Sequence, residues 1–547
     1  MAVASGLVIA AMALGWWFTG HGMIAAADSA SYLGTAQNIA EGRGVTSPLA
    51  PETASTDPAA QVAARGEQAQ THWPPLYSTA IAVVHQAGAG LFQAARIVNV
   101  AALGAAVALL CVLAWTWAPD RWGVAVAAVV VVLLGPAPEL ALLPRGLLGA
   151  SATVLSELAF LPFLLVVVAA TAWLDVAPRR LAAVALGGVV GATLVRYVGA
   201  GLGLVPAGAI LLLRRPLRRA WVAIALGLAA AGPATVVLWT KFSGVLWGGE
   251  AARGVRWHPP HDLSLPVTAM AGWVGIPAHA PLALRALAAT ALVAGSCALV
   301  ASARLRRFLA GPAGDPRRAS LLLALGLTVP SYLAITLASR ALLDALIPLD
   351  SRILLPVQPV VGLTVVLVAH GLVERALAHR THPVAHAARF ADAAIVVAVL
   401  IVALTVGAGR TVRDDARLVD RTVHAPTAAG RANRFQGLPA DTVIFTNQPS
   451  RMWFRTGLPT QVLPHPVDPL TDAPNQRFRE QVQALGPILQ DHPGLVVLGP
   501  DLLPNDSPTP ADLDAVEGLA RVATCDGELV WGVPGSAAST AIAARCA

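Results

Sequence analysis

Long apolar runs recur along the first 410 residues and constrain the fold more than any other feature of the chain. An uncharged apolar run of about 17–25 residues can cross the hydrocarbon core of a bilayer as an α-helix. Only 13% of the residues are charged, against about 25% in soluble domains. The sequence predicts a mainly α polytopic membrane protein with about 11 transmembrane helices, at 2–18, 95–117, 122–143, 155–174, 181–198, 200–213, 219–240, 281–303, 319–341, 352–373 and 392–409. The 181–213 stretch fits either two short helices or one long helix.

Arginine placement predicts the side of the membrane on which each loop lies. The clusters fall in alternate loops and so on one side, provided that 76–92 does not span. Their members are Arg121, Arg179, Arg180, Arg214, Arg215, Arg218, Arg219, Arg304, Arg306, Arg307, Arg317, Arg318, Arg375, Arg380 and Arg389. Basic residues concentrate in cytoplasmic loops, so we expect 76–92 to be an interfacial helix, the N-terminus to be cytoplasmic, and loop 19–94 to be outside.

The last part of the chain, 411–547, has a different composition and predicts a small extracytoplasmic α/β domain. Strand patterns at 441–447, 495–498 and 528–533 alternate with helix patterns at 449–456, 476–491 and 511–520. A disulfide between Cys525 and Cys546 is chemically allowed on that side of a membrane. Cys111 and Cys297 lie in predicted spans and are expected to pack as small apolar residues.

Several classes of function are disfavoured by what the sequence contains. The net charge of +7 is explained by cytoplasmic arginines, so a nucleic-acid partner is not expected. No nucleotide-binding glycine motif is present, and no His/Asp cluster has metal-ligand spacing, so we predict no cofactor, with dependence on a divalent metal left open. A membrane enzyme without a nucleotide site on its outer face must take an activated substrate from the lipid.

Six short motifs in the membrane part resemble the GT-C superfamily of integral membrane glycosyltransferases, which includes protein O-mannosyltransferases and aminoarabinose transferases. They are Asp28–Tyr32, His72–Tyr77, Arg96–Asn99, Ser156-Glu157, Thr193–Tyr197 and Asp350–Pro356. The resemblance implies transfer of a sugar from a polyprenyl-phosphate donor to a hydroxyl acceptor at the outer face of a bacterial-type plasma membrane. The acceptor (glycan, lipid or protein) stays open. Many members carry a pair of acids where this chain has Asp28 followed by Ser29.

That reaction needs a base, a phosphate site and a surface for the sugar. A carboxylate accepts the hydroxyl proton, and cations stabilise the departing phosphate. We assign Asp28 as the base, which implies inversion at the sugar carbon, and Glu157 as a second base or acceptor-orienting group. Phosphate-side candidates are His72, Arg145, Arg196, Lys241, Arg253, Arg256 and Arg352. Substrate-contacting aromatic candidates are Tyr32, Trp73 and Tyr77, with Trp247 and Trp257 as further aromatics.

Structural alternatives exist for the main candidates. Asp28 also fits the N-cap of a helix starting near Ser31, and Glu157 also fits a structural bridge to Arg145. Asp350 and Arg352 also fit a local salt bridge. At the level of function, a transporter or flippase of lipid-linked substrates and a non-catalytic scaffold remain open, as does transfer of a group other than a sugar. Span interiors are almost free of charge, no internal repeat is visible, and charges gather at the outer ends of the spans, which favours an interfacial enzyme over a transporter.

Overall fold

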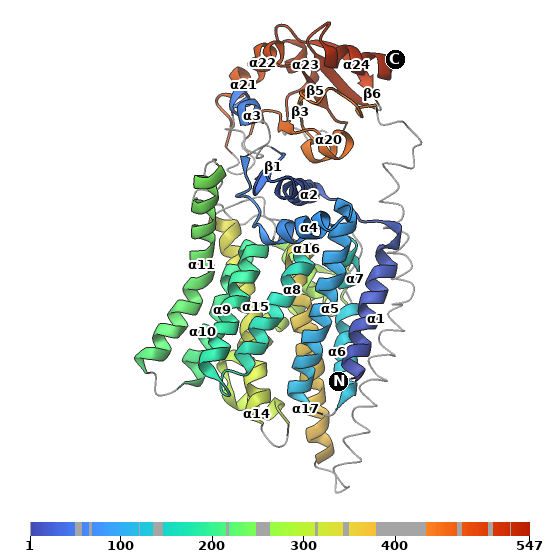
Figure 1. Ribbon diagram of the computed structural model, residues 1–547. Coiled ribbons are helices and arrows are strands. Elements are labelled where there is room, and N and C mark those ends of the chain that lie inside the picture. The colour runs from blue at the N-terminus through green and yellow to red at the C-terminus, as the bar shows by residue number, and fades with distance from the viewer. Residues whose placement is uncertain are drawn as a thin grey trace.

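The computed structural model describes most of the chain. The described residues are 2–49, 57–64, 68–119, 121–134, 146–214, 218–247, 257, 263–311, 315–342, 349–378, 434–467, 473–500, 507–525 and 527–547. They form a helical bundle and, beyond one end of it, a smaller domain built on a sheet (Figure 1).

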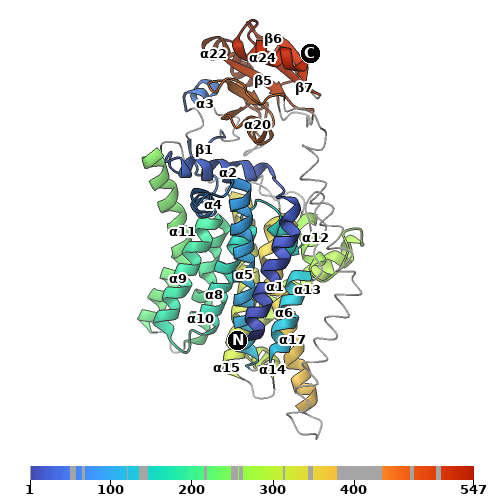
Figure 2. The ribbon, with the colours of Figure 1, turned by 45° about the vertical axis from the view of Figure 1, so that its right-hand side comes forward.

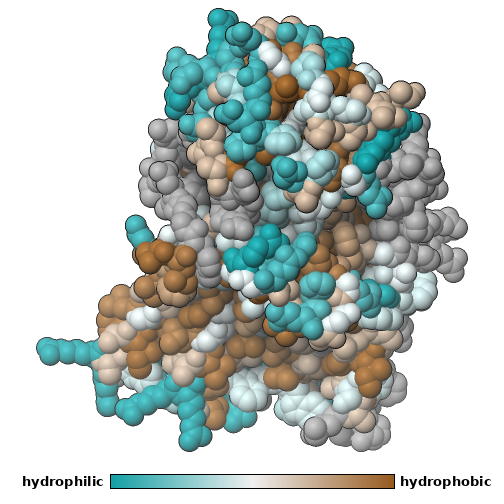
Figure 3. Space-filling model, turned by 45° about the horizontal axis from the view of Figure 1, so that its top comes forward, coloured by the Kyte–Doolittle hydropathy of each residue, from teal (hydrophilic) through white to brown (hydrophobic). Residues whose placement is uncertain are grey.

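The bundle is built from apolar helices. They are α1 (Ala2–Phe18), α5 (Leu91–Trp117), α6 (Trp122–Leu134), α8 (Glu157–Ala172), α9 (Pro178–Val195), α10 (Leu204–Leu213), α11 (Arg219–Trp247), α13 (Leu282–Ala301), α15 (Pro316–Leu342) and α17 (Gln358–Ala378). Within the described residues, six helices are long and apolar enough to cross a membrane, and four more apolar helices are shorter. Helix α8 packs against α5, α9 and α15, and its buried leucines and valines join the main core. Apolar side chains gather over the bundle, whereas the smaller domain is largely hydrophilic on the visible face (Figure 3).

The predicted spans coincide with these helices, and the multi-pass membrane class is confirmed, although the number of eleven is not. The span expected at 392–409 lies outside the described residues. The 181–213 stretch forms two helices, with the 3-10 segment η2 (Tyr197–Gly203) between α9 and α10. The segment packs closely on α11, because a Cβ at Gly203 would lie 2.1 Å from the Leu228 carbonyl oxygen.

Two short helices lie across one end of the bundle, which we call the α2 end. They are α2 (Ala27–Ala40) and α4 (Leu76–Gln86), and both run roughly across the directions of the bundle helices (Figures 1 and 2). Of the expected helix 76–92, residues 76–86 form α4, whose eleven residues are too few to span, and residues 91–92 already belong to α5. The starts of α9, α11 and α15, which carry arginine clusters, lie at the opposite end with α14 (Ala303–Leu309).

Further short elements complete the bundle. They are η1 (Thr19–His21), α7 (Gly146–Ser151), α12 (Ser264–Gly272), α16 (Ser351–Leu354) and η3 (Leu355–Val357). Helix α16 continues through η3 into α17, so the late span begins with a short turn at the α2 end.

The smaller domain is a five-stranded mixed sheet flanked by helices. The strand order is β4-β3-β5-β7-β6, with β4, β3 and β5 parallel and β7 and β6 antiparallel. The strands are β3 (Val443–Thr446), β4 (Thr460–Val462), β5 (Gly494–Leu498), β6 (Ala520–Cys525) and β7 (Glu528–Gly532). The helices are α20 (Pro449–Thr456), α21 (Phe478–Gln483), α22 (Leu485–Asp491), α23 (Pro510–Asp514) and α24 (Ala537–Cys546).

The sequence patterns located three of these strands and missed two. Strand β4 has only three residues, too few to show alternation. Strand β6 begins at Ala520, so the helix expected over 511–520 is wrong beyond Asp514. The helix expected over 476–491 is divided at Ala484 into α21 and α22.

The first loop of the bundle is joined to the edge of this sheet. Gln61 of α3 (Pro58–Ala64) accepts from the Val462 amide at 3.0 Å and donates to the Val462 carbonyl at 3.4 Å. The Thr460 amide donates to the Pro48 carbonyl at 3.3 Å, just after the short pairing of β1 (Thr46–Ser47) with β2 (Gln68–Ala69). Exposed edge strands invite pairing with other chains, so this loop protects β4 and links the domain to α2.

Cys525 and Cys546 form a disulfide that ties β6 to the last helix. Of the other two cysteines, Cys111 is buried in the core as expected, whereas Cys297 is exposed on the surface of α13. A small surface position of this kind tolerates substitution, which makes Cys297 a matched control for the disulfide.

We expect Cys525→Ser to destabilise the smaller domain by about 2–4 kcal/mol, since the cross-link restricts the unfolded chain. Limited proteolysis of the purified protein should then cleave within 434–547 at least tenfold faster than in the wild type. Cys297→Ser should leave the cleavage rate unchanged. Equal rates in all three proteins would contradict a stabilising role for the disulfide.

Candidate active site

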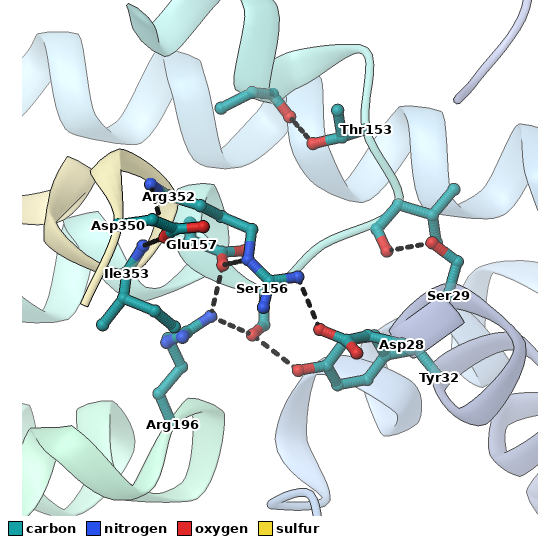
Figure 4. A network of polar contacts seen from close by, with 12 residues as sticks. Asp28, Ser29, Tyr32, Thr153, Ser156, Glu157, Arg196, Asp350, Arg352 and Ile353 are labelled. Carbon is teal, nitrogen blue, oxygen red and sulfur yellow. Dashed lines mark hydrogen bonds and ion pairs between the residues drawn. The ribbon is translucent and has the colours of Figure 1, made fainter. Parts of the chain in front are cut away.

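Four charged side chains from four separate segments meet at the α2 end (Figure 4). Arg352 Nη1 lies 2.7 Å from Asp28 Oδ2, and Arg196 Nη1 lies 2.8 Å from Glu157 Oε1. Arg352 Nε lies 3.8 Å from the same Glu157 oxygen and so connects the two pairs. The cluster holds two carboxylates and two guanidinium groups, which balance in charge.

Local structure places each of these groups. Glu157 is the first residue of α8, where a carboxylate interacts favourably with the helix dipole. Arg196 lies at the break between α9 and η2. Arg352 lies in the first turn of α16, whose N-cap is Asp350.

Asp350 does not pair with the Arg352 side chain, contrary to the local salt bridge considered above. Its carboxylate accepts hydrogen bonds from the backbone amides of Arg352 at 3.0 Å and Ile353 at 3.1 Å. Capping by Asp350 fixes the first turn of α16, so the Arg352 side chain extends to Asp28 instead.

Asp28 is not a helix cap. Helix α2 begins at Ala27, four residues before the expected start, and its N-cap is Ala26. The Asp28 carboxylate is engaged by Arg352. Glu157 likewise pairs with Arg196, whereas its alternative partner Arg145 lies outside the described residues.

The two ion pairs differ in their exposure. The side chains of Glu157 and Arg196 are 3% and 10% exposed, whereas those of Asp28 and Arg352 are 21% and 17% exposed. Glu157 Oε2 has no hydrogen-bond partner among the residues that the structure describes. Burial raises the pKa of the Asp28 carboxyl above its usual range, against the opposing effect of the Arg352 charge. Of the two pairs, Asp28–Arg352 is the more exposed.

Aromatic side chains support the same cluster. The Tyr32 hydroxyl lies 2.9 Å from Ser156 Oγ, which also accepts a hydrogen bond from Arg196 Nη1 at 3.1 Å. The Tyr32 ring packs against Trp73 and Tyr77, with centroids 5.5 and 5.1 Å away. Tyr32 and Tyr77 are buried, so Trp73, which is half-buried, is the most accessible of the three aromatic candidates.

Ser29 occupies the position of the missing second acid and ties two segments together. Its hydroxyl accepts from the Ala26 amide at 2.9 Å and donates to the Val154 carbonyl at 2.8 Å. The Ile24 amide and carbonyl also pair with Ala152 and Val154, at 2.7 and 3.0 Å. These contacts fix the start of α2 against the segment that leads into Glu157. The same set of hydrogen bonds therefore positions both Asp28 and Glu157.

Asn99 of α5 adds further hydrogen bonds to the segment that leads into Glu157. Its amide donates to the Thr153 carbonyl at 2.7 Å, and its own oxygen accepts from the Tyr77 hydroxyl at 3.0 Å. Sequence reasoning assigned no separate role to Ser29, Asn99 or Ser156. Asn99 carried a usable signal, because a polar residue inside an apolar span is costly unless it is hydrogen-bonded.

A Ser29→Ala substitution should lower the rate of the reaction at this site by about tenfold without unfolding the protein. The substitution removes two hydrogen bonds, each contributing about 1 kcal/mol. Asp28 and Glu157 are then held less firmly relative to each other, and the rate falls because reacting groups are no longer well placed. Ser29→Thr, which keeps the hydroxyl, should restore most of the rate. A loss of folded protein without any change in turnover per folded molecule would contradict a positioning role.

The structure describes some of the remaining candidates and not others. His72 is half-buried with its ring edge-on to Trp73 at 4.8 Å. Lys241 is exposed near the end of α11, and Trp257 is also exposed. Arg145, Arg253 and Arg256 lie outside the described residues. Among the described residues, no group of three or more His, Cys, Asp or Glu side chains is placed to hold a metal ion.

Comparison with known proteins shows the fold. The chain is similar to a crystal structure of ArnT from Cupriavidus metallidurans bound to undecaprenyl phosphate, with a TM-score of 0.57 and 15% sequence identity. The match covers 97% of this chain and 98% of the other. The fold is therefore GT-C-like, that of a mainly helical, multi-pass membrane protein. No family model and no curated protein matches the sequence.

Proposed function

We propose that this protein transfers a sugar from a polyprenyl-phosphate donor to a hydroxyl acceptor at the membrane face that carries α2. The observation that carries this proposal is the Asp28–Arg352 pair, a partly exposed carboxylate and guanidinium 2.7 Å apart. The reaction needs a proton acceptor and a phosphate-binding cation close together, and these two groups provide them.

The proposed chemistry is a single displacement. The acceptor hydroxyl oxygen attacks the anomeric carbon while its proton passes to Asp28. The bond from that carbon to the phosphate oxygen breaks, and its electron pair stays on the phosphate. One displacement inverts the configuration at the sugar carbon.

The other charged groups have supporting roles in this proposal. Arg352 stabilises the negative charge that grows on the leaving phosphate. Arg196 is held by Glu157 and Ser156 and adds positive potential behind the reacting atoms. Glu157, with one carboxylate oxygen lacking a partner among the described residues, orients the acceptor hydroxyl. Trp73 offers an aromatic surface for the sugar.

The fold supports a lipid-linked donor. The ArnT crystal structure that this chain resembles contains undecaprenyl phosphate, and in this chain helices α2 and α4 lie across one end of the bundle (Figure 2). The arginine pattern of the loops favours the extracytoplasmic face for this end. A lipid-borne donor also explains why the chain carries no nucleotide-binding motif.

A panel of radiolabelled polyprenyl-phosphate sugars tests the proposal. Purified protein in liposomes should transfer label from at least one donor to a hydroxyl acceptor present in cell-envelope extract. The label should leave the lipid fraction only when protein and acceptor are both present. Movement of intact labelled lipid between leaflets, with no transfer, would support the flippase alternative instead.

A further inference from the structure

The Asp28–Arg352 pair raises a question about charge during the proposed reaction. A sugar linked through a phosphodiester carries one negative charge, and ionised Asp28 carries another. After transfer, Asp28 holds the proton and is neutral, while the released polyprenyl phosphate is a monoester with up to two negative charges. The reaction therefore moves one negative charge from the carboxylate to the phosphate.

Arg352 is placed to follow that charge. Its Nη1 contacts Asp28 at 2.7 Å in a single-point contact, and its Nε is 3.8 Å from Glu157. Arg196 is less available, because it is held by Glu157 and Ser156 and is only 10% exposed. Of the two arginines, Arg352 is the more exposed, and its partner Asp28 is the group that loses its charge in the proposed reaction.

We propose that Arg352 serves Asp28 and the phosphate in turn, so that ionised Asp28 and a phosphomonoester compete for one guanidinium group. This inference rests on the proposed function and deepens it. Binding of the polyprenyl phosphate product is then coupled to protonation of Asp28. Release of that product requires Asp28 to lose its proton and recover Arg352, which resets the base for the next cycle.

The surroundings of Asp28 are compatible with such coupling. The groups that act on it electrostatically are Arg352 of α16, Glu157 of α8, Arg196 before η2, and Tyr32 of its own helix. Helix α20 contacts α2 next to Asp28 through an uncharged group, because the Ser450 hydroxyl donates to the Ala27 carbonyl at 2.9 Å. Burial already raises the pKa of the Asp28 carboxyl. A phosphate dianion bound nearby would raise that pKa further, so that Asp28 takes up a proton.

Binding of undecaprenyl phosphate to the purified full-length protein tests the competition. At pH 7.5 the phosphate is mainly a dianion, since the second pKa of a phosphomonoester is about 6. We expect Asp28→Asn to bind it at least about tenfold more tightly than the wild type, equivalent to about 1.4 kcal/mol. We also expect the wild type to take up a proton on binding, measured by calorimetry in buffers of different ionisation enthalpy, and Asp28→Asn to take up none.

Controls separate the phosphate from the lipid tail and from folding. Undecaprenol, which lacks the phosphate, should bind the two proteins equally. Arg352→Gln should weaken binding of the phosphate and abolish proton uptake, which tests the same coupling if Asp28→Asn folds poorly.

The outcomes are distinct. Binding to both proteins with equal or weaker affinity for Asp28→Asn, or wild-type binding without proton uptake, would overturn the competition while leaving the proposed function in place. If none of the three proteins (wild type, Asp28→Asn and Arg352→Gln) bound undecaprenyl phosphate, the proposed function and this inference would both be overturned.

Discussion

Asp28→Asn is expected to lower the rate of sugar transfer by about 10²–10⁴-fold, the usual contribution of a positioned general base. Asparagine keeps the size of the side chain and accepts a hydrogen bond from Arg352, so α2 should stay in place. It cannot accept the acceptor's proton at neutral pH. The measurement is the initial rate of transfer from a labelled polyprenyl-phosphate sugar, per folded molecule.

The pH dependence of the same assay gives an independent check. The base must be ionised, and burial raises the pKa of the Asp28 carboxyl. The wild-type rate should therefore rise with pH through that pKa and level off above it, at a higher pH than an ordinary aspartate would give. The residual rate of Asp28→Asn should lack this rise.

Asp57→Asn is the matched control. Asp57 lies in the same loop, is exposed, and accepts a hydrogen bond from the Ala59 amide at the start of α3. Asparagine serves equally well at such a position, so this variant should transfer at the wild-type rate. Transfer by Asp28→Asn at the same rate as by Asp57→Asn would remove Asp28 as the base.

Glu157→Leu is expected to destabilise the folded protein by about 3–5 kcal/mol, because it leaves the buried Arg196 without its carboxylate. Unfolding in SDS, followed by near-ultraviolet circular dichroism, measures the change. The double variant Glu157→Leu/Arg196→Leu should recover most of the stability, since replacing both partners of a buried pair by apolar groups is often neutral.

Activity should not recover with stability in that double variant. The Asp28–Arg352 pair stays intact, but the groups proposed to orient the acceptor and to add positive potential are gone. A double variant as unstable as Glu157→Leu would contradict a stabilising pair. A stable double variant with full transfer would remove Glu157 and Arg196 from the reaction.

The helices of the bundle were predictable because the signal is local. A run such as 95–117 carries a single charge, Arg96 near its start, and the matching helix α5 covers Leu91–Trp117. Counting arginines on the two sides predicted that 76–92 does not span, and α4 is too short to do so. The short strand β4 was not predictable, because its three residues are paired on one side by β3 and on the other by residues of the first loop.

The candidate site was predictable only as a set of residue types. Asp28, Glu157, Arg196 and Arg352 were all chosen from the sequence, but so were His72, Lys241 and residues outside the described ranges. Nothing local distinguishes Arg352, which meets Asp28, from Lys241, which is exposed on α11. In the sequence, Ser29 stands out only because many GT-C proteins have an acid at that position. Its hydrogen bond to the Val154 carbonyl, 125 residues away, is visible only in the structure.

The sequence by itself determined that the chain is a multi-pass helical membrane protein with polar motifs at one end, because hydrophobic length and charge placement are properties of short segments. Only the tertiary structure decided which charges meet. Arg352 and Asp28 are 324 residues apart along the chain, and their contact depends on how α2 packs against α4 and α5. Pairing at such separation is fixed by packing of the whole bundle, and no local pattern of residues encodes it.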